Sequence, residues 1–340
     1  MKKLNIAICT TNATYTSGGV SRATMELAQA FIKAGYKITF IYKLGDPSKF
    51  EGTNSIIIPF IRIPFFNSLN YSIRLYKVLD EIKPDLVITQ LNTAPLWGKI
   101  KYPHAHIIHN LQILEAIHAD ITPGFFGEVP LMTLLEIMNI KRSDYVYAVN
   151  RELKNNIDRL YKVNCNILLW GINQSIFKPG AKYTRNTIPK IITVTSGNNR
   201  RKNLFNLIEA CRNLNVELRL TNCPYHKLPQ NVVNLGRISD KQLVEELQNA
   251  DLFVLPSKQE SFGIATLEAL ACNKPVVITR TGIWHEVLEA KAGIVTGTSK
   301  KEIQEAIKKA LNTDFVNNPA HLAKKYNWDI TVQQMTSKLT

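Results

Sequence analysis

The chain has 340 residues and a formal net charge of +15, and 45% of its residues are hydrophobic while 20% are charged. This is the composition of a globular protein, so a disordered or low-complexity chain is excluded, and the length predicts two domains of roughly 100–200 residues each. No apolar run reaches the ~20 residues that cross a bilayer, and the five cysteines are scattered without a C-x-x-C pair. We therefore expect a reduced, cytoplasmic protein with neither a disulfide framework nor a zinc site.

Short apolar segments alternate with segments of helical period through the first half of the chain. The predicted strands are 4–10, 37–43, 85–90, 104–110, 144–150 and 166–171, and the predicted helix is 21–36. In that helix Met25, Ala28 and Phe31 fall on one face, and Gly35 supplies a C-terminal stop.

The same pattern restarts after a polar stretch at 171–190, which is marked by glycine and proline and predicts a linker. The later strands are 190–197, 217–222, 232–236, 251–257 and 275–280, and the helices are 203–214, 240–250, 265–272 and 299–312. Strand–helix alternation implies parallel sheets with right-handed crossovers. A single eight-stranded barrel would also fit the length, but the linker and the restart favour two open, doubly wound α/β domains facing a cleft.

The basic excess is spread along the chain and favours anionic partners: a nucleotide diphosphate, an acidic membrane surface or nucleic acid. Solubility alone is the alternative explanation. No acid occurs between Glu51 and Asp80, and this window holds Arg62, Arg74, Lys77, Phe60, Phe65, Phe66, Tyr71 and Tyr76. We predict a surface there that touches anionic lipid; a strand followed by a core helix is the alternative.

Two carboxylates, Glu260 and Glu268, frame an apolar segment that follows the predicted strand 251–257. Ser261 is a plausible N-cap for a helix that runs to about Ala271. Glu260 would then lie on the loop before the helix, and Glu268 would lie at the edge of the buried face.

The start of this predicted helix suits an anionic ligand. The amide groups of Ser261, Phe262 and Gly263 would point out of it and favour a phosphate, and glycine lets a ligand approach the backbone. The two flanking carboxylates could accept hydrogen bonds from sugar hydroxyls. A plain helix cap with a nearby acid is the alternative.

This segment resembles the carboxylate signature of retaining GT-B-fold glycosyltransferases, family four (glycosyl transferases group 1), which use nucleotide-diphosphate sugars. The matching residues are Pro256, Ser257, Glu260, Phe262, Gly263, Glu268, Ala269, Ala271, Pro275 and Val276. Five further segments resemble the family in the same order: 16–31, 143–157, 234–257, 282–296 and 326–339.

The resemblance implies two Rossmann-like domains. The N-terminal, acceptor-side domain would comprise 1–170, with a C-terminal helix at 327–340 packing back on it. The nucleotide-sugar domain would comprise 171–326. The chain departs from the family at Trp170 and Asn173 in the linker.

The resemblance also implies roles for individual residues around the donor. Gly18 and Gly19 would line the cleft, Glu268 would bind the ribose, and the backbone around Arg237 and Ile238 would contact the base. Ser261, Phe262 and Gly263 would lie beside the donor.

For the transfer itself, Lys202 would neutralise the departing diphosphate. The family arginine is replaced by Ser196, and we expect Arg201, in preference to Arg200, to supply its charge. Glu260 would hold the sugar hydroxyls.

His109 would contact the sugar, although a structural role is equally expected for a histidine at a strand end. The sequence contains no Asp-x-Asp motif, so neither a metal nor another cofactor is expected.

We therefore predict a retaining hexosyltransferase that moves sugar from a UDP- or GDP-sugar to a glycan or lipid-linked acceptor in cell-envelope polysaccharide or lipopolysaccharide synthesis. It would be cytoplasmic, with peripheral association at the inner membrane face as an extension. A nucleic acid acceptor, namely a modified base in DNA, is the alternative. A sugar-nucleotide epimerase or a non-catalytic sugar-nucleotide-binding protein is a further one.

Overall fold

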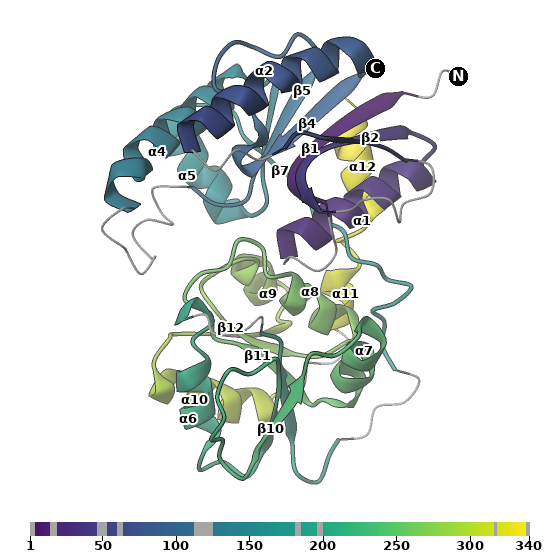
Figure 1. Ribbon diagram of the computed structural model, residues 1–340. Coiled ribbons are helices and arrows are strands. Elements are labelled where there is room, and N and C mark those ends of the chain that lie inside the picture. Colours follow the sequence, from purple (N-terminus) through teal and green to yellow (C-terminus); the bar gives the residue numbers. More distant parts are fainter. Residues whose placement is uncertain are drawn as a thin grey trace. The chain divides into compact units, whose positions relative to one another are not determined.

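The structure is a computed structural model that describes residues 4–13, 19–45, 53–59, 64–111, 125–180, 185–195, 200–315 and 318–337. The chain divides into two compact units, and each contains one sheet (Figure 1). Unit 1 comprises Met1–Gly171 with Trp328–Thr340, and unit 2 comprises Ile172–Asn327. In both sheets the paired strands run parallel, which is the α/β class expected from the sequence.

The sheet of unit 1 has the strand order β3-β2-β1-β4-β5-β6-β7. Its strands are β1 (Asn5–Ala13), β2 (Lys37–Gly45), β3 (Thr53–Ile57), β4 (Leu86–Gln90), β5 (His104–Ile108), β6 (Tyr145–Ala148) and β7 (Asn166–Ile167). The order reverses between β1 and β4, which pair directly. In doubly wound sheets ligands bind beyond the carboxyl ends of the strands at such a reversal.

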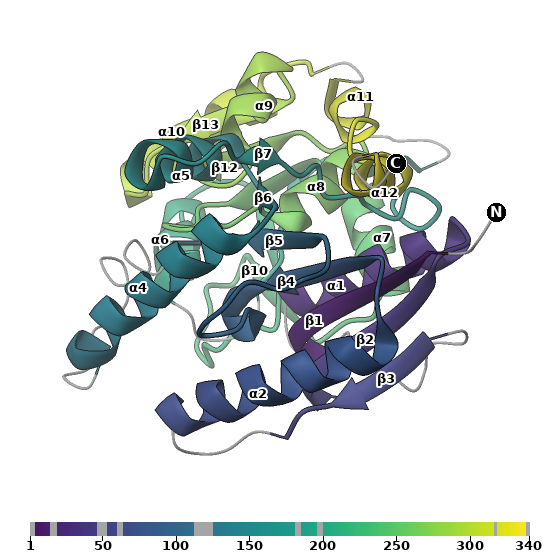
Figure 2. The ribbon, with the colours of Figure 1, turned by 90° about the horizontal axis from the view of Figure 1, so that it is seen from above.

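Helices cover both faces of this sheet. They are α1 (Gly19–Lys33), α2 (Pro64–Ile82), α4 (Phe125–Arg142), α5 (Arg151–Tyr161) and α12 (Trp328–Thr336). The view from above places α1 and α12 on one side and α2, α4 and α5 on the other (Figure 2). The end of α1 is as expected, because Gly35 adopts a φ of +92° and the amide of Tyr36 donates to the carbonyl of Phe31.

The acid-free window between Glu51 and Asp80 forms β3 and α2, so the alternative of a strand and a core helix describes its architecture. Tyr71 was expected on the surface but is 2% exposed, because it packs with Leu75 and Leu79 against the sheet. Arg74 and Lys77 lie on the exposed side of α2. Phe60 and Arg62 lie outside the described residues, as do the side chains of Phe65 and Phe66.

Unit 2 repeats the same plan with the strand order β10-β9-β8-β11-β12-β13. Its strands are β8 (Lys190–Thr193), β9 (Glu217–Thr221), β10 (Val232–Gly236), β11 (Leu252–Leu255), β12 (Val276–Thr279) and β13 (Gly293–Thr296). Its helices are α6 (Leu204–Cys211), α7 (Asp240–Asn249), α8 (Ile264–Ala271), α9 (Trp284–Glu289), α10 (Lys300–Leu311) and α11 (Asn318–Ala323), with a short 3-10 turn, η2 (Arg200–Lys202). The order reverses between β8 and β11.

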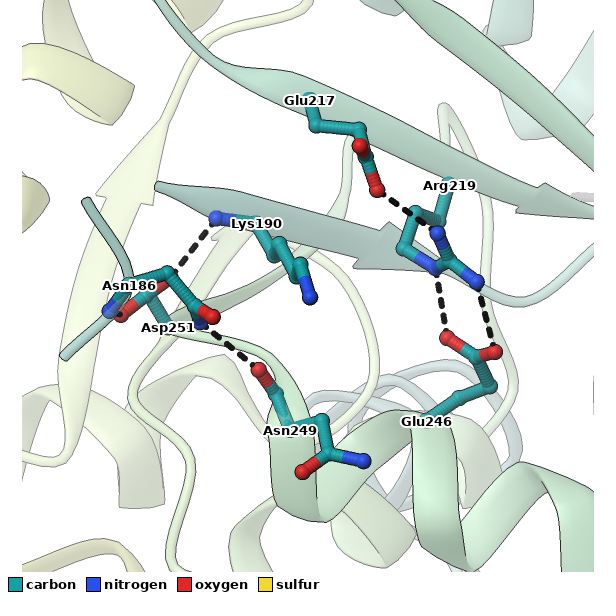
Figure 3. A network of polar contacts seen from close by, with 7 residues as sticks. All are labelled: Asn186, Lys190, Glu217, Arg219, Glu246, Asn249 and Asp251. Carbon is teal, nitrogen blue, oxygen red and sulfur yellow. Dashed lines mark hydrogen bonds and ion pairs between the residues drawn. The ribbon is translucent and has the colours of Figure 1, made fainter. Parts of the chain in front are cut away.

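Polar side chains form hydrogen bonds and ion pairs at the amino ends of strands in unit 2 (Figure 3). Asp251, which is 7% exposed, accepts hydrogen bonds from the amide of Lys190 (2.7 Å) and from the side chain of Asn186 (2.8 Å). Arg219 on β9 forms a bidentate pair with Glu246 on α7, at 2.6 and 2.8 Å. The network therefore anchors this end of the sheet, opposite the strand ends where ligands bind.

Replacing Asp251 with alanine should lower the free energy of unfolding by about 2–4 kcal/mol, because the amide of Lys190 and the side chain of Asn186 lose a buried charged acceptor. Urea denaturation followed by circular dichroism measures the change. Glu245→Ala, at an exposed position of α7, is the matched control and should stay within about 0.5 kcal/mol of the parent. A loss no larger than that of the control would contradict the role assigned to Asp251.

None of the described helices combines the length and the apolar character that crossing a membrane requires.

Candidate functional site

Two loops of unit 2 leave the carboxyl ends of β8 and β11, the strands between which the order reverses. The first loop ends in η2 with Lys202, and the second carries Glu260. Lys202 Nζ lies 2.6 Å from Glu260 Oε1, and the amide of Lys258 donates to the carbonyl of Arg201 at 2.7 Å. The fold therefore joins two sequence-predicted site residues at the position where a doubly wound sheet binds its ligand.

The Lys202–Glu260 pair is partly buried but reachable from solvent. The side chains are 23% and 14% exposed, respectively. Each neutralises the other in this arrangement. A phosphate could engage the ammonium group of Lys202, and sugar hydroxyls could donate to the carboxylate of Glu260.

The helices that begin beside the central strands of unit 2 lack side-chain caps. Asn203 before α6 and Gly263 before α8 adopt left-handed conformations with φ of 55° and 85°, and neither provides a capping hydrogen bond. By contrast, Ser239 and Ser299 form capping boxes at α7 and α10, which follow the edge strands. The first amide groups of α6 and α8 therefore lack the side-chain acceptor that a cap supplies, and such groups favour an anion.

The helix after Glu260 begins later than a cap at Ser261 would place it, and one residue before the predicted span 265–272. Ser261 is not its N-cap, because the left-handed φ of Gly263 interrupts the helical conformation and α8 starts at Ile264. Ser261 and Phe262 thus lie in the loop, and the ring of Phe262 packs edge-on against Tyr326 at 5.7 Å.

A neighbouring glycine holds this loop closely. A Cβ atom on Gly282 would meet the carbonyl oxygen of Phe262 at 2.4 Å, so a larger residue there would displace the loop.

Glu268 is more buried than expected. It was predicted at the edge of the buried face of its helix, but only 3% of it is exposed. The reason is that most residues of α8 are buried, so this short helix has no broad exposed face.

Some of the remaining predicted residues of unit 2 adjoin the Lys202–Glu260 pair, and others follow a more distant strand. Arg200 and Arg201 are exposed and adjoin Lys202 in η2. Arg237 is exposed and Ile238 half-buried, and both follow the edge strand β10, two positions from β8. Ser196 lies outside the described residues.

In unit 1, His109 follows β5 and is 4% exposed. Its Nε2 lies 3.0 Å from Oε1 of Gln90, and its ring stacks on Trp170 at 5.6 Å and 21°. Burial lowers the pKa of His109 to about 3, so the ring is neutral at pH 7. Gly19, which is exposed, begins α1, and Gly18 lies outside the described residues.

Two further histidines of unit 1 share one hydroxyl group. Thr89 Oγ1 lies 2.7 Å from Nε2 of His104 and 2.8 Å from Nδ1 of His106. Burial lowers the pKa of His104 to about 3 and that of His106 to about 4. All three buried histidines of β5 and its end are therefore neutral near pH 7.

Sequence reasoning did not identify Gln90, the partner of His109. The available signal was a polar residue at the end of a predicted central strand, at the carboxyl edge where ligands bind.

Comparison with known proteins agrees with this architecture. Residues 17–171 match the family model described as glycosyltransferase family 4, and residues 179–327 match the model described as glycosyl transferases group 1. The O-antigen chain mannosyltransferase RfbU of Salmonella typhimurium is 27% identical over 233 residues, which span 62% of this chain and 64% of that protein.

Two solved structures share the fold along almost the whole length. Sucrose-phosphate synthase from Thermosynechococcus elongatus superposes with a TM-score of 0.82 at 17% identity, covering 99% of this chain and 98% of that one. HepE from Anabaena, solved with UDP and glucose, superposes with a TM-score of 0.74 at 14% identity, covering 99% of both chains.

Proposed function

Because the chain belongs to the GT-B-fold glycosyltransferases of group 1 and family four, we propose that it moves a hexose-type sugar from a UDP- or GDP-sugar to a glycan or lipid-linked acceptor, with retention of anomeric configuration. The contact between Lys202 and Glu260 carries this proposal. A cation and a carboxylate beside two uncapped helix starts suit a diphosphate joined to a polyhydroxyl sugar. Similarity to an O-antigen mannosyltransferase supports a role in cell-envelope polysaccharide or lipopolysaccharide synthesis.

The departing diphosphate gains negative charge as its bond to the sugar breaks. Lys202 would neutralise this charge, together with the amide groups at the starts of α6 and α8. Arg201 would take the place of the family arginine, with Arg200 as its neighbour in the same turn. These groups are in place before the reaction, so they stabilise the leaving group without reorganisation.

Glu260 would grip the hydroxyls of the transferred sugar. Retaining hydrolases use two carboxylates about 5–5.5 Å apart, one of them as a nucleophile. Glu260 is instead bonded to Lys202, which suits a hydrogen-bond acceptor better than a nucleophile. An oxygen of the donor phosphate would then take the proton of the acceptor hydroxyl.

The nucleoside would extend from the diphosphate across the strand ends of unit 2. Two strand spacings separate β8 from β10, which is about 10 Å and leaves room for a ribose between phosphate and base. The backbone of Arg237 and Ile238 would contact the base, and Glu268 would accept from the ribose. Ser261, Phe262 and Gly263 would line the phosphate side.

Screening UDP-, GDP- and ADP-sugars by thermal shift should identify one donor that raises the Tm, because ligand at 100 times its Kd stabilises the folded state by about 2.7 kcal/mol. Transfer of the sugar from that donor should proceed at the same rate in EDTA, since cationic side chains would neutralise the diphosphate. Absence of stabilisation by every donor would contradict the proposal. Loss of transfer in EDTA would contradict its metal independence.

The products of the same assay separate the alternatives. Conversion of the sugar nucleotide without an acceptor would indicate an epimerase, and binding without turnover would indicate a binding protein. Transfer to DNA, accompanied by binding that weakens steeply with salt, would indicate a nucleic acid acceptor.

We also propose that unit 1 touches an anionic membrane surface through α2 and the segment beside it. Ile73, Arg74 and Lys77 are exposed on α2. Trp97, which is 39% exposed, lies beside α2, because its carbonyl accepts a hydrogen bond from Tyr76 of that helix. Exposed basic and aromatic side chains on one surface suit anionic headgroups.

Vesicles of phosphatidylglycerol and phosphatidylcholine should sediment the protein at low salt and release it at high salt. Arg74→Glu with Lys77→Glu should reduce sedimentation at least several-fold, because about 1 kcal/mol of attraction is lost per basic residue. The control is Lys308→Glu with Lys309→Glu, an equal charge change on exposed positions of α10 in unit 2. Equal loss in both variants would refute a specific surface on α2.

A further inference from the structure

A line of buried polar groups crosses the carboxyl end of the sheet of unit 1, beside the reversal between β1 and β4. Thr24 on α1 and Gln90 at the end of β4 are each 1% exposed, and His109 after β5 is 4% exposed. Thr24 Oγ1 lies 2.8 Å from the carbonyl oxygen of Val20, and Gln90 Nε2 lies 2.7 Å from Thr24 Oγ1. His109 Nε2 completes the line at 3.0 Å from Gln90 Oε1.

The direction of each hydrogen bond in this line follows from its first member. The carbonyl of Val20 can only accept, so the hydroxyl of Thr24 must donate to it. Thr24 Oγ1 then accepts from the amide nitrogen of Gln90, and Gln90 Oε1 consequently faces His109. A carbonyl oxygen can only accept, so His109 Nε2 must carry the hydrogen, and in the neutral ring Nδ1 then carries the lone pair.

The opposite orientation of the Gln90 amide is excluded by the same contacts. It would place Oε1 against Thr24 Oγ1, whose hydrogen is already donated to Val20, and two oxygen atoms would meet without a hydrogen between them. The backbone of Gln90 is also fixed. Its backbone N–H donates to Thr93 Oγ1 at 3.0 Å, and the hydroxyl of Thr93 contacts the carbonyl of Cys9 on β1 at 3.0 Å.

We propose that Gln90 is a positioning residue that holds His109 in the tautomer protonated at Nε2, so that Nδ1 accepts a hydrogen bond from a sugar hydroxyl. This inference rests on the proposed sugar transfer. Among the described residues, none is bonded to Nδ1 of His109. Trp170 covers one face of the ring and directs a ligand to its edge.

The arrangement determines what kind of ligand group His109 can recognise. Burial lowers the pKa of His109 to about 3, so the ring brings no positive charge to the site. Its free lone pair accepts from a hydroxyl and repels a phosphate or carbonyl oxygen. His109 therefore selects a ligand that offers a hydroxyl group.

The tautomer can be observed directly by long-range ¹H–¹⁵N correlation on protein labelled at histidine nitrogen, in which protonated and unprotonated ring nitrogens resonate far apart. Wild-type His109, assigned through the loss of its signals in His109→Gln, should show a protonated Nε2 and an unprotonated Nδ1. Observation of the opposite tautomer would overturn the proposal.

Substitution of Thr24 tests the hydrogen-bonded line from Thr24 through Gln90 to His109, because Thr24 contacts Gln90 and not His109. Thr24→Val removes the acceptor that orients the Gln90 amide, so His109 should populate both tautomers. The kcat of sugar transfer should then fall about tenfold, the usual effect of one hydrogen bond, with the KM for the donor little changed. Thr24→Ser keeps the hydroxyl and should restore both signals and rate.

The control is Thr89→Val, one residue before Gln90 on β4, which is also buried and contacts His104 and His106. It should leave the signals of His109 in place. Unchanged His109 signals and kcat in Thr24→Val would overturn the positioning role while leaving the transferase assignment intact. Conversely, the expected tautomer without transfer from any donor would overturn the proposed function and the hydroxyl-binding role of Nδ1.

Discussion

Replacing Lys202 with methionine is expected to lower kcat by about 10²–10³-fold, because the departing diphosphate would lose a preorganised cation. Methionine keeps an unbranched side chain of similar size and removes the ammonium group with its charge and hydrogen-bond donors. The variant should stay folded, since the ion pair with Glu260 is partly exposed at 23% and 14% and such pairs contribute little to stability. Steady-state kinetics with the donor identified by thermal shift measures the effect.

Glu260→Gln tests whether Glu260 binds the hydroxyls of the sugar independently of the binding of the diphosphate by Lys202. It leaves Lys202 without its carboxylate partner, so binding of the nucleoside diphosphate alone should persist while transfer of the sugar slows. Lys301→Met is the control for Lys202→Met, because it makes the same charge change at an exposed position of α10, and it should leave both properties unchanged. Full activity of Lys202→Met would place the diphosphate elsewhere.

Acid is expected to unfold unit 1 steeply as the pH falls from about 6.5 toward 4. Burial lowers the pKa values of His104, His106 and His109 to about 3, 4 and 3, below the ordinary value near 6.5 of an unfolded chain. The unfolded state therefore binds protons that the folded state does not, and the stability present at neutral pH is lost on acidification. Each group contributes a slope of about 1.4 kcal/mol per pH unit, so three together approach roughly 4 kcal/mol per unit.

Urea denaturation at several pH values measures this slope. His106→Gln should reduce it by about one third, because one of three proton-linked groups is removed. His226→Gln, at an exposed position of unit 2, is the matched control. Should His106→Gln prove too unstable to study, proton uptake on unfolding of the parent protein at pH 5 tests the same point, and an uptake below one proton would refute it.

The two-sheet architecture could be predicted from the sequence because the central parallel strands are mostly apolar and alternate with segments of helical period, and most of the expected strands appear in the structure. The strand β3 was left as an alternative because Asn54 and Ser55, which are exposed at the edge of the sheet, give it no apolar pattern. The helix α2 was left as an alternative because two prolines and an arginine interrupt the apolar sequence at its start.

The site could be predicted in part. Glu260 and Lys202 were identified by resemblance to a family, and only the reversal of strand order brings these residues, 58 positions apart, into contact. The start of α8 was misplaced because the sign of φ at Gly263 cannot be read from residue type. Gln90 was missed because its role depends on hydrogen bonds to Thr24 and His109, which lie on other elements.

A crystal structure of the protein with the nucleotide sugar that stabilises it would test the central claim most directly. We predict density for the diphosphate within hydrogen-bond distance of Lys202 Nζ and of the amide groups that begin α6 or α8, with sugar hydroxyls on Glu260. Diphosphate density at another place, with the 2.6 Å bond between Lys202 and Glu260 intact, would contradict the account.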